Sequence, residues 1–270
     1  MLEILKAIFL GIVQGITEWL PVSSTGHMIL VDQFLHLSGS DRFISTFLVV
    51  IQFGSILAVL MIYFEKLNPF SKRKSPKARK ATWDLWLKVI IAVVPSGIIG
   101  VLFEEQIDKV FFRPSVVAAA LIIYGIIMIW LENRHKRPKI TKFSQVSYKT
   151  ALYIGMFQIL ALVPGTSRSG STIIGAVLLG TSRYIAAEFS FFLAIPTMLG
   201  ASLLKLLKAG FAFSAFEWLI MFVGSFVAFV VSVIVIKFFI SYIKKHDFKA
   251  FGVYRIVLGL IVFLYFAFTR

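Results

Sequence analysis

The chain contains no cysteine, which excludes a fold held together by disulfide bonds and a metal site built from thiolate ligands. Charged residues are also scarce, because only 15% of the 270 residues are Asp, Glu, Lys or Arg, whereas 59% are hydrophobic. Soluble domains usually carry about 25% charged residues. The composition therefore excludes an ordinary soluble domain.

Long apolar runs account for much of the sequence. Residues 47–64, 116–131 and 221–236 carry no charge, and with their flanks each run reaches the roughly 20 residues that a transmembrane helix requires. The runs are continuous, whereas the strands of a membrane β-barrel alternate polar and apolar residues. The sequence therefore predicts an all-α polytopic membrane protein.

The few charges are mostly positive, with 28 Lys and Arg against 13 Asp and Glu and a net charge of +15. The basic residues gather between the apolar runs, in residues 65–88, 132–149 and 237–255, and the last of these clusters includes Arg255. Loops rich in Lys and Arg are typical of the cytoplasmic side of a membrane. We therefore interpret the charge as a sign of topology and expect no nucleic-acid binding.

Two stretches of the sequence resemble one another. Residues 11–30 read GIVQGITEWLPVSSTGHMIL and residues 155–174 read GMFQILALVPGTSRSGSTII. Each runs through an apolar segment into a proline, then into hydroxyl residues and glycine, and then back into apolar sequence. Each is followed by three long apolar runs, and an odd number of crossings inverts the second half relative to the first. The sequence predicts a single membrane domain, residues 1–270, made of two inverted-topology repeats, 1–135 and 145–270.

Each repeat is predicted to hold one interrupted helix pair and three full spans. The second arms of the interrupted pairs, residues 28–37 and 173–179, are much shorter than the roughly 20 residues of a span, so we expect re-entrant pairs and six crossings. Counting positive loops does not distinguish six crossings from ten, because two extra crossings per half leave every later loop in place. The expected spans are residues 47–64, 85–103, 115–131, 187–207, 218–240 and 251–268.

The loop charges agree with this topology. If the basic segment 65–88 is cytoplasmic, alternation places residues 104–113 outside, and that segment holds three acids against two bases. It also places the weakly charged segment 205–217 outside, together with both termini. We expect the first interrupted pair to re-enter from outside, so the site between the halves should open to the extracytoplasmic face.

Inverted halves with broken helices indicate a central binding site, in which the half-helix N-termini direct positive dipole ends at an anion. Gln14 and Glu18 are four residues apart and share one helix face. A carboxylate within an apolar segment costs several kcal/mol unless it is paired or hydrated, which makes Glu18 a candidate functional residue.

The hydroxyl residues after Pro21 begin the second arm of the first pair. Ser23 and Thr25 are interpreted either as helix caps or as ligand-binding groups. His27 is either a satisfied buried imidazole or, three residues from Ser24, part of a base and nucleophile pair.

The second interruption, PGTSRSGST at residues 164–172, surrounds Arg168 with hydroxyl side chains. Gly165 and Gly170 allow the backbone to approach a ligand closely. An arginine among hydroxyls at a helix N-terminus is arranged as a clamp for phosphate or carboxylate would be. The alternatives are that Arg168 extends to the membrane surface or pairs with Glu18 across the two halves. The hydroxyl residues are Thr166, Ser167, Ser169, Ser171 and Thr172.

Three segments carry a resemblance to a known family: QGITEWLPVSSTGH at residues 14–27, PGTSRSGST at 164–172 and AAEFSFFLAIP at 186–196. With them the chain resembles, over its full length, the integral-membrane undecaprenyl-pyrophosphate phosphatases of the bacitracin-resistance type. The resemblance implies hydrolysis of undecaprenyl diphosphate to undecaprenyl phosphate and inorganic phosphate in the bacterial cell (inner) membrane. This reaction recycles the lipid carrier of cell-wall peptidoglycan synthesis and confers bacitracin resistance. Gln14 stands where many members of the family have a second glutamate.

The matched residues lead to a mechanistic hypothesis that leaves the nucleophile open. Ser24 attacks the terminal phosphorus, or water does so under His27, or His27 itself is the nucleophile; Glu18 or His27 takes the proton, and Arg168 stabilises the phosphoryl oxygens. Mg²⁺ or Ca²⁺ is expected on Glu18, with Gln14 and the substrate phosphates as further ligands. The residues expected to bind the diphosphate are Ser23, Thr25, Gly165, Thr166, Ser167, Ser169 and Thr172.

The expected partners are the polyprenyl diphosphate and the surrounding membrane lipid, and a homodimer is left open. A rival hypothesis is a transporter or flippase for an anion or anionic lipid, because inverted repeats and broken helices are equally typical of transporters. A scaffold whose motifs only pack is a third hypothesis. Ser24 and His27 beside a carboxylate favour chemistry over transport.

Overall fold

The computed structural model describes residues 1–134 and 136–269, and in these ranges it contains helices and no strand. Helices α3, α5, α6, α9, α10 and α11 are each long and apolar enough to cross a membrane, which confirms the six predicted spans. The helices are α1 (Leu2–Thr17), α2 (Ser24–Val31), α3 (Asp41–Ile62), α4 (Phe64–Leu67), α5 (Pro76–Phe111), α6 (Pro114–Asn133), α7 (Tyr148–Ile159), α8 (Arg168–Leu178), α9 (Arg183–Ala209), α10 (Ala215–Ile243) and α11 (Lys249–Phe268).

The boundary between α5 and α6 differs from the prediction. Residues 104–113 were expected to form a loop, but α5 continues to Phe111 and the chain turns within two residues. Arg113 has an extended backbone before Pro114, which is the conformation that a following proline favours and which a helix cannot continue through. Pro114 then begins α6, where its missing N–H costs nothing.

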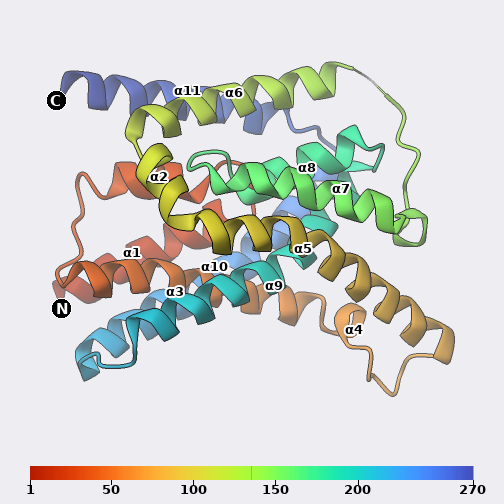
Figure 1. Ribbon diagram of the computed structural model, residues 1–270, viewed down its shortest axis with the longest axis horizontal. Helices are drawn as coiled ribbons and strands as arrows, with labels where there is room; N and C mark the ends of the chain where they lie inside the picture. The colour runs from red at the N-terminus through yellow and green to blue at the C-terminus, as the bar shows by residue number, and fades with distance from the viewer. Residues whose placement is uncertain (135, 270) are drawn as a thin grey trace.

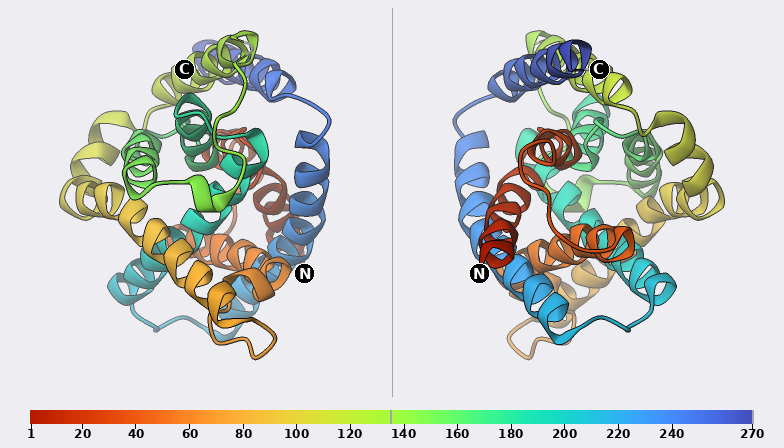
Figure 2. Two further views of the ribbon diagram at one scale, coloured as in Figure 1. Left: turned by 90° about the vertical axis from the view of Figure 1, so that its right-hand side faces the viewer. Right: turned by 90° about the vertical axis from the view of Figure 1, so that its left-hand side faces the viewer.

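The two ends of the molecule carry different connections (Figure 1). Both termini lie at one end, together with the α5–α6 turn and the α9–α10 turn, whereas the segments joining α4 to α5 and α6 to α7 lie at the other end. This is the arrangement that alternating crossings predict. Figure 2 looks onto each end in turn.

The helices of the two halves have matching neighbours. Helix α1 packs on α10 as α7 packs on α5, α2 contacts α11 as α8 contacts α6, and α6 and α11 lie side by side. Two copies of one unit packed around a shared axis would give this pattern. The inverted relation between the halves stays a prediction, and residues 135 and 270, the last residues of the predicted repeats, lie outside the described part of the chain.

Glycine allows the closest helix contacts. A Cβ atom on Gly54 in α3 would lie 2.2 Å from the carbonyl oxygen of Ser225 in α10, and one on Gly155 in α7 would lie 2.1 Å from that of Ala92 in α5. Both distances are shorter than van der Waals contact. Any side chain at these positions would force the helices apart.

Helix α9 lies at the centre of the largest apolar cluster. Its residues from Ile185 to Ile195 are buried on every side, and Phe189, Phe191 and Phe192 supply much of the packed volume. A helix that is apolar around its whole circumference is expected in a core. The polar exceptions on α9, Glu188 and Ser190, therefore need partners.

Candidate active site

The two interruptions have the same local structure. Ser23 before α2 and Ser167 before α8 have φ angles of 73° and 74°, and among the described residues they are the two non-glycine residues with positive φ. Each seryl oxygen accepts a hydrogen bond from the backbone N–H three residues later, Gly26 at 3.3 Å and Gly170 at 3.1 Å. The capping interpretation of Ser23 is therefore confirmed. A backbone strained in the same way at both positions is typical of a functional site.

Glu18 connects the two interruptions. Its Oε1 atom lies 3.1 Å from Nη2 of Arg168, and its Oε2 atom accepts hydrogen bonds from Nε2 of Gln14 at 2.9 Å and from Oγ of Ser24 at 3.2 Å. The carboxylate is buried at the end of α1. The predicted pairing of Arg168 with Glu18 is present, and it brings both motifs to one point.

Arg168 also donates hydrogen bonds to α9. Its Nη1 atom donates to the carbonyl oxygen of Ser190 at 2.9 Å, and its guanidinium lies 5.7 Å from the ring centroid of Trp19. The Nε–H of Arg168 is buried and has no hydrogen-bond partner among the described residues. The guanidinium is thus fixed in place while one of its donors remains unused, which suits an anion-binding group.

The other hydroxyls near Arg168 bind protein groups in this structure. Ser169 donates to the carbonyl oxygens of Glu18 at 3.2 Å and Leu20 at 3.1 Å, which ties the start of α8 to the end of α1. Thr172 donates to the carbonyl oxygen of Arg168 at 2.8 Å and lies 2.7 Å from Oγ of Ser190. Their predicted role in diphosphate binding stays a prediction, as does that of Thr25, which is half-buried in the first turn of α2.

His27 does not pair with Ser24. Its Nδ1 atom lies 2.7 Å from the carbonyl oxygen of Ser23, and its Nε2 atom lies 2.6 Å from the hydroxyl of Tyr254, on which its ring stacks. Both ring nitrogens are therefore occupied, and the hydroxyl of Ser24 points to Glu18. The expected seryl-imidazole pair is absent because the backbone one turn earlier takes Nδ1.

Arg255 was assigned to a cytoplasmic basic cluster, and this assignment is wrong. Its side chain is fully buried in α11, with Nη1 donating to the carbonyl oxygen of Pro21 at 3.2 Å and Nη2 donating to those of Gly165 and Thr166 at 2.9 Å each. One guanidinium thus satisfies carbonyls of both interruptions. A signal was present in the sequence, since Arg255 lies alone inside a predicted span, where ionisable residues are expected to be functional.

Comparison with known proteins places the chain in a family. The family described as "Bacitracin resistance protein BacA" matches residues 7–261. The chain belongs to this family.

Curated relatives match this chain over nearly its whole length. It is 75% identical to Undecaprenyl-diphosphatase 1 of Clostridioides difficile strain 630, over 98% of this chain and 97% of that relative. It is 57% identical to Undecaprenyl-diphosphatase of Acetivibrio thermocellus, over all of both chains, and 58% identical to Undecaprenyl-diphosphatase of Enterococcus faecalis, over 97% of each. The family resemblance that the three sequence segments indicated is therefore confirmed.

A divalent cation at this BacA-type site would have one carboxylate from the protein. The described residues contain no group of three or more His, Cys, Asp or Glu side chains that could hold a metal ion. Glu18 already accepts hydrogen bonds on both oxygens, and Gln14 adds an amide rather than a second carboxylate. A cation would fit here if the phosphate oxygens of a ligand supplied most of its coordination, as is common for Mg²⁺.

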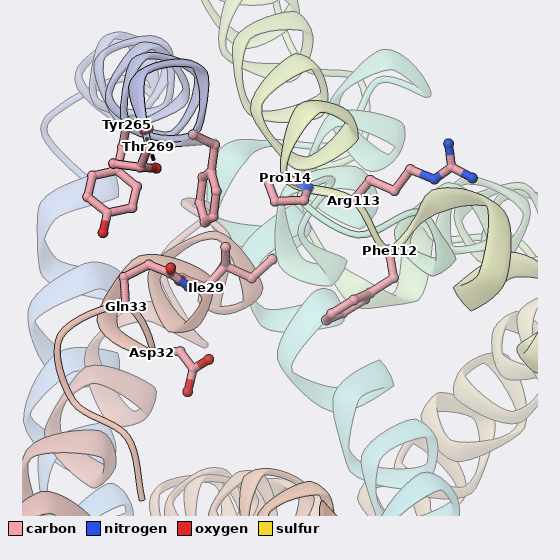
Figure 3. A pocket seen from close by; sticks show the side chains of 9 residues that line it. Ile29, Asp32, Gln33, Phe112, Arg113, Pro114, Tyr265 and Thr269 are labelled. Atoms are coloured by element: carbon pink, nitrogen blue, oxygen red, sulfur yellow. Dashed lines mark hydrogen bonds between the residues drawn. The ribbon is translucent and has the colours of Figure 1, made fainter.

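A cavity lies at the far end of α2 from Ser24 (Figure 3). It has a volume of about 540 Å³ and is lined by the end of α2, the α5–α6 turn and the end of α11. Asp32 and Gln33, which directly follow α2, line the cavity, whereas the side chain of Arg113 points away from it. Glu18, Ser24 and Arg168 are not among its lining residues, so this cavity is a surface feature near the termini rather than the candidate active site. Its lining residues are Ile29, Asp32, Gln33, Phe112, Arg113, Pro114, Tyr265, Phe266 and Thr269.

Proposed function

We propose that the protein hydrolyses undecaprenyl diphosphate to undecaprenyl phosphate and inorganic phosphate, and so recycles the carrier lipid of cell-wall synthesis and confers resistance to bacitracin. The relatives with 57–75% identity carry the name undecaprenyl-diphosphatase. The observation that carries the proposal is the convergence of Ser24 and Arg168 on the buried carboxylate of Glu18. This arrangement offers a nucleophile, a base and a phosphate-binding cation at one point between broken helices.

The proposed reaction has two steps. The Ser24 Oγ atom attacks the terminal phosphorus, so that a new O–P bond forms while the bond from phosphorus to the bridging oxygen breaks and undecaprenyl phosphate leaves. Glu18 accepts the proton of the seryl hydroxyl and passes it to the departing undecaprenyl phosphate. Water, deprotonated by Glu18, then attacks the phosphoserine; the Oγ–P bond breaks, inorganic phosphate is released, and Glu18 returns the proton to the Ser24 oxygen. Arg168 and the free N–H groups at the starts of α2 and α8 neutralise the charge of the transferring phosphoryl group.

Glu18 is favoured over His27 as the base because of the hydrogen bonds around the imidazole. A carbonyl oxygen can only accept, so Nδ1 of His27 carries its proton toward Ser23, and Nε2 is left to accept from Tyr254. The alternatives are direct attack by water and a phosphohistidine on His27. Trapping the ³²P-labelled enzyme distinguishes all three, since phosphoserine survives acid, phosphohistidine does not, and direct attack by water leaves no label.

A divalent cation completes the proposal. We place Mg²⁺ or Ca²⁺ on the carboxylate of Glu18 and the amide oxygen of Gln14, with the remaining ligands supplied by the substrate phosphates and water. Bound there, the cation would supply further neutralisation of phosphate charge.

Release of inorganic phosphate from undecaprenyl diphosphate by the purified protein tests the function. We expect turnover by the wild type and severe loss in Glu18→Ala and Arg168→Ala. A wild type that binds the lipid but releases no phosphate would instead support the transporter hypothesis. The variant Lys72→Ala, in an exposed segment at the end of the molecule opposite to the termini, is the control and should keep full activity.

We also propose that the active site opens to the extracytoplasmic face of the cell membrane. The natural absence of cysteine makes this testable with single cysteines on an otherwise unreactive chain. In intact cells an impermeant thiol reagent should label Ala212→Cys, in the α9–α10 turn, and should label Lys72→Cys only after the membrane is opened. The reverse pattern would invert the proposed orientation.

A further inference from the structure

A second cavity, with charged residues in its lining, lies away from Glu18 and Arg168. Its volume is about 270 Å³, and it lies between the end of α3, the start of α9 and the last turns of α10. These elements meet at the end opposite to the termini, onto which the left view of Figure 2 looks. We call it the α9–α10 cavity. It is lined by Ile62, Tyr63, Tyr184, Glu188, Ile236, Lys237, Ile240, Ser241 and Lys244.

The acid in the α9–α10 cavity is already neutralised. Glu188 is buried, and its Oε2 atom lies 2.5 Å from Nζ of Lys66 while its Oε1 atom accepts from the hydroxyl of Tyr184 at 2.7 Å. The ammonium group of Lys66 is in turn 4.3 Å from the ring centroid of Phe143. Glu188 therefore has no charge to offer to a further cation.

The two remaining lysines have no acidic partner. Lys237 in α10 and Lys244, the residue that caps its C-terminus, are seven residues apart and so share one side of the helix, and neither pairs with a carboxylate of the described residues. Lys244 lies 5.6 Å from the ring centroid of Tyr184. With Lys66 balanced by Glu188, the cavity carries two unpaired positive charges and the hydroxyl of Ser241.

The position of Lys237 indicates the kind of anion. It lies inside the apolar span of α10, six residues before the helix ends at Ile243. A lysine at that depth extends toward the headgroup layer of a membrane. Basic pockets between transmembrane helices on the side rich in positive loops bind anionic lipid headgroups.

The face of α10 that leads to the cavity can hold a lipid chain. Exposed apolar side chains recur at every fourth residue along it and so form one stripe, which ends beside Lys237. The stripe consists of Phe222, Phe226, Val230, Ile234 and Phe238, each at least 40% exposed.

We propose that the α9–α10 cavity binds the phosphate headgroup of an anionic membrane lipid through Lys237 and Lys244, with the lipid chain along the exposed stripe of α10. The site is separate from Glu18 and Arg168, and the proposal does not depend on the hydrolysis proposed above. The ligand class is a lipid phosphate ester rather than free phosphate, because the cavity opens beside an apolar face.

Native mass spectrometry of the purified full-length protein with dioleoyl phosphatidylglycerol tests the proposal. We expect the double variant Lys237→Gln with Lys244→Gln to bind the lipid roughly 10- to 30-fold more weakly. This is the expected loss when two lysines that contact anionic lipid headgroups are neutralised. Lys72→Gln with Lys245→Gln is the control, because it removes the same charge from exposed positions outside the cavity. Equal weakening in both double variants would reduce the effect to general surface charge and overturn the proposal.

Two further measurements distinguish the sources of phosphate and locate the chain. Inorganic phosphate should not displace the lipid; displacement with the same dependence on the two lysines would make this a free-phosphate site and overturn the lipid assignment. A phosphatidylglycerol with a diazirine in its acyl chain should cross-link to Ile234 and Phe238. Cross-links spread evenly over the other spans would contradict the proposed path.

Discussion

Arg168 and Glu18 form an ion pair of 3.1 Å between segments 150 residues apart, and both side chains are largely buried. Removing two charges from water costs several kcal/mol for each ion, so apolar side chains of the same volume would often stabilise a fold as well or better. The pair is therefore better explained by function than by stability. It also joins the end of α1 to the start of α8, which positions both interruptions at one place.

The variant Arg168→Lys is expected to lose activity while keeping its charge. A lysine has one ammonium nitrogen in place of the two guanidinium nitrogens that bind Glu18 and the Ser190 carbonyl. The kcat for phosphate release should therefore fall by about 10³-fold or more, the range found for arginines that stabilise phosphoryl transfer. The matched control is Arg134→Lys, on an exposed arginine beside Trp130. Near-normal turnover by Arg168→Lys would remove Arg168 from the proposed reaction.

The variant Gln14→Glu tests the proposed cation. It places a second carboxylate where the amide now lies 2.9 Å from Glu18, and two carboxylates that close require a cation or a proton between them. We expect the Mg²⁺ or Ca²⁺ concentration for half-maximal activity to fall, and thermal stability to become dependent on the cation. Gln106→Glu adds the same charge at an exposed position and should change neither quantity. Activity that is unaffected by chelators in both the wild type and Gln14→Glu would argue against a metal.

The sequence was sufficient for the spans and for the convergence of the two motifs. Continuous apolar runs identify transmembrane helices without knowledge of their neighbours, and the polar interruptions must meet somewhere shielded from lipid. Glu18 and Arg168 could be paired on this basis, because each is a charge that requires a partner in an apolar setting. The start of each half-helix followed from its hydroxyl residues, as Ser23 and Ser167 show.

Other features depend on contacts that spacing alone does not specify. Ser24 and His27 are close in sequence, but the Ser23 carbonyl and the Tyr254 hydroxyl determine where the imidazole points, and Tyr254 belongs to the last helix. Arg255 lies near lysines in the sequence and was grouped with them, although its turn of α11 faces the interior. Loop charge similarly suggested that the helix ends before Glu104, whereas α5 continues to Phe111.

Two glycine substitutions test the close packing of α3 against α10. Gly54→Ala should destabilise the protein because the new methyl group would meet the Ser225 carbonyl oxygen at 2.2 Å, so that α3 and α10 must separate. Gly200→Ala, inside α9 with no atom within 4 Å of the new methyl group, should be neutral or stabilising, since alanine favours a helix by about 1 kcal/mol over glycine. Thermal unfolding in detergent measures both. Equal effects of the two substitutions would show that the close contact between α3 and α10 is unimportant.

Arg255 offers the sharpest test of how the two interruptions are held in register. Arg255→Leu leaves the carbonyls of Pro21, Gly165 and Thr166 without their donor, at a cost of roughly 1–3 kcal/mol for each buried group. We expect a clearly lower unfolding temperature and a loss of phosphate release. Ser24 and Arg168 directly follow the loops whose hydrogen bonds to Arg255 are lost. Arg255→Lys, with one ammonium for three acceptors, should be intermediate in both measurements. Lys249→Leu removes a half-buried charge from the first turn of the same helix, where it lies 3.9 Å from Asp247 and far from the interruptions in sequence, and should change neither. An Arg255→Leu variant that keeps wild-type stability and turnover would mean that the interruptions hold their shape without it, and that the buried guanidinium serves some other purpose.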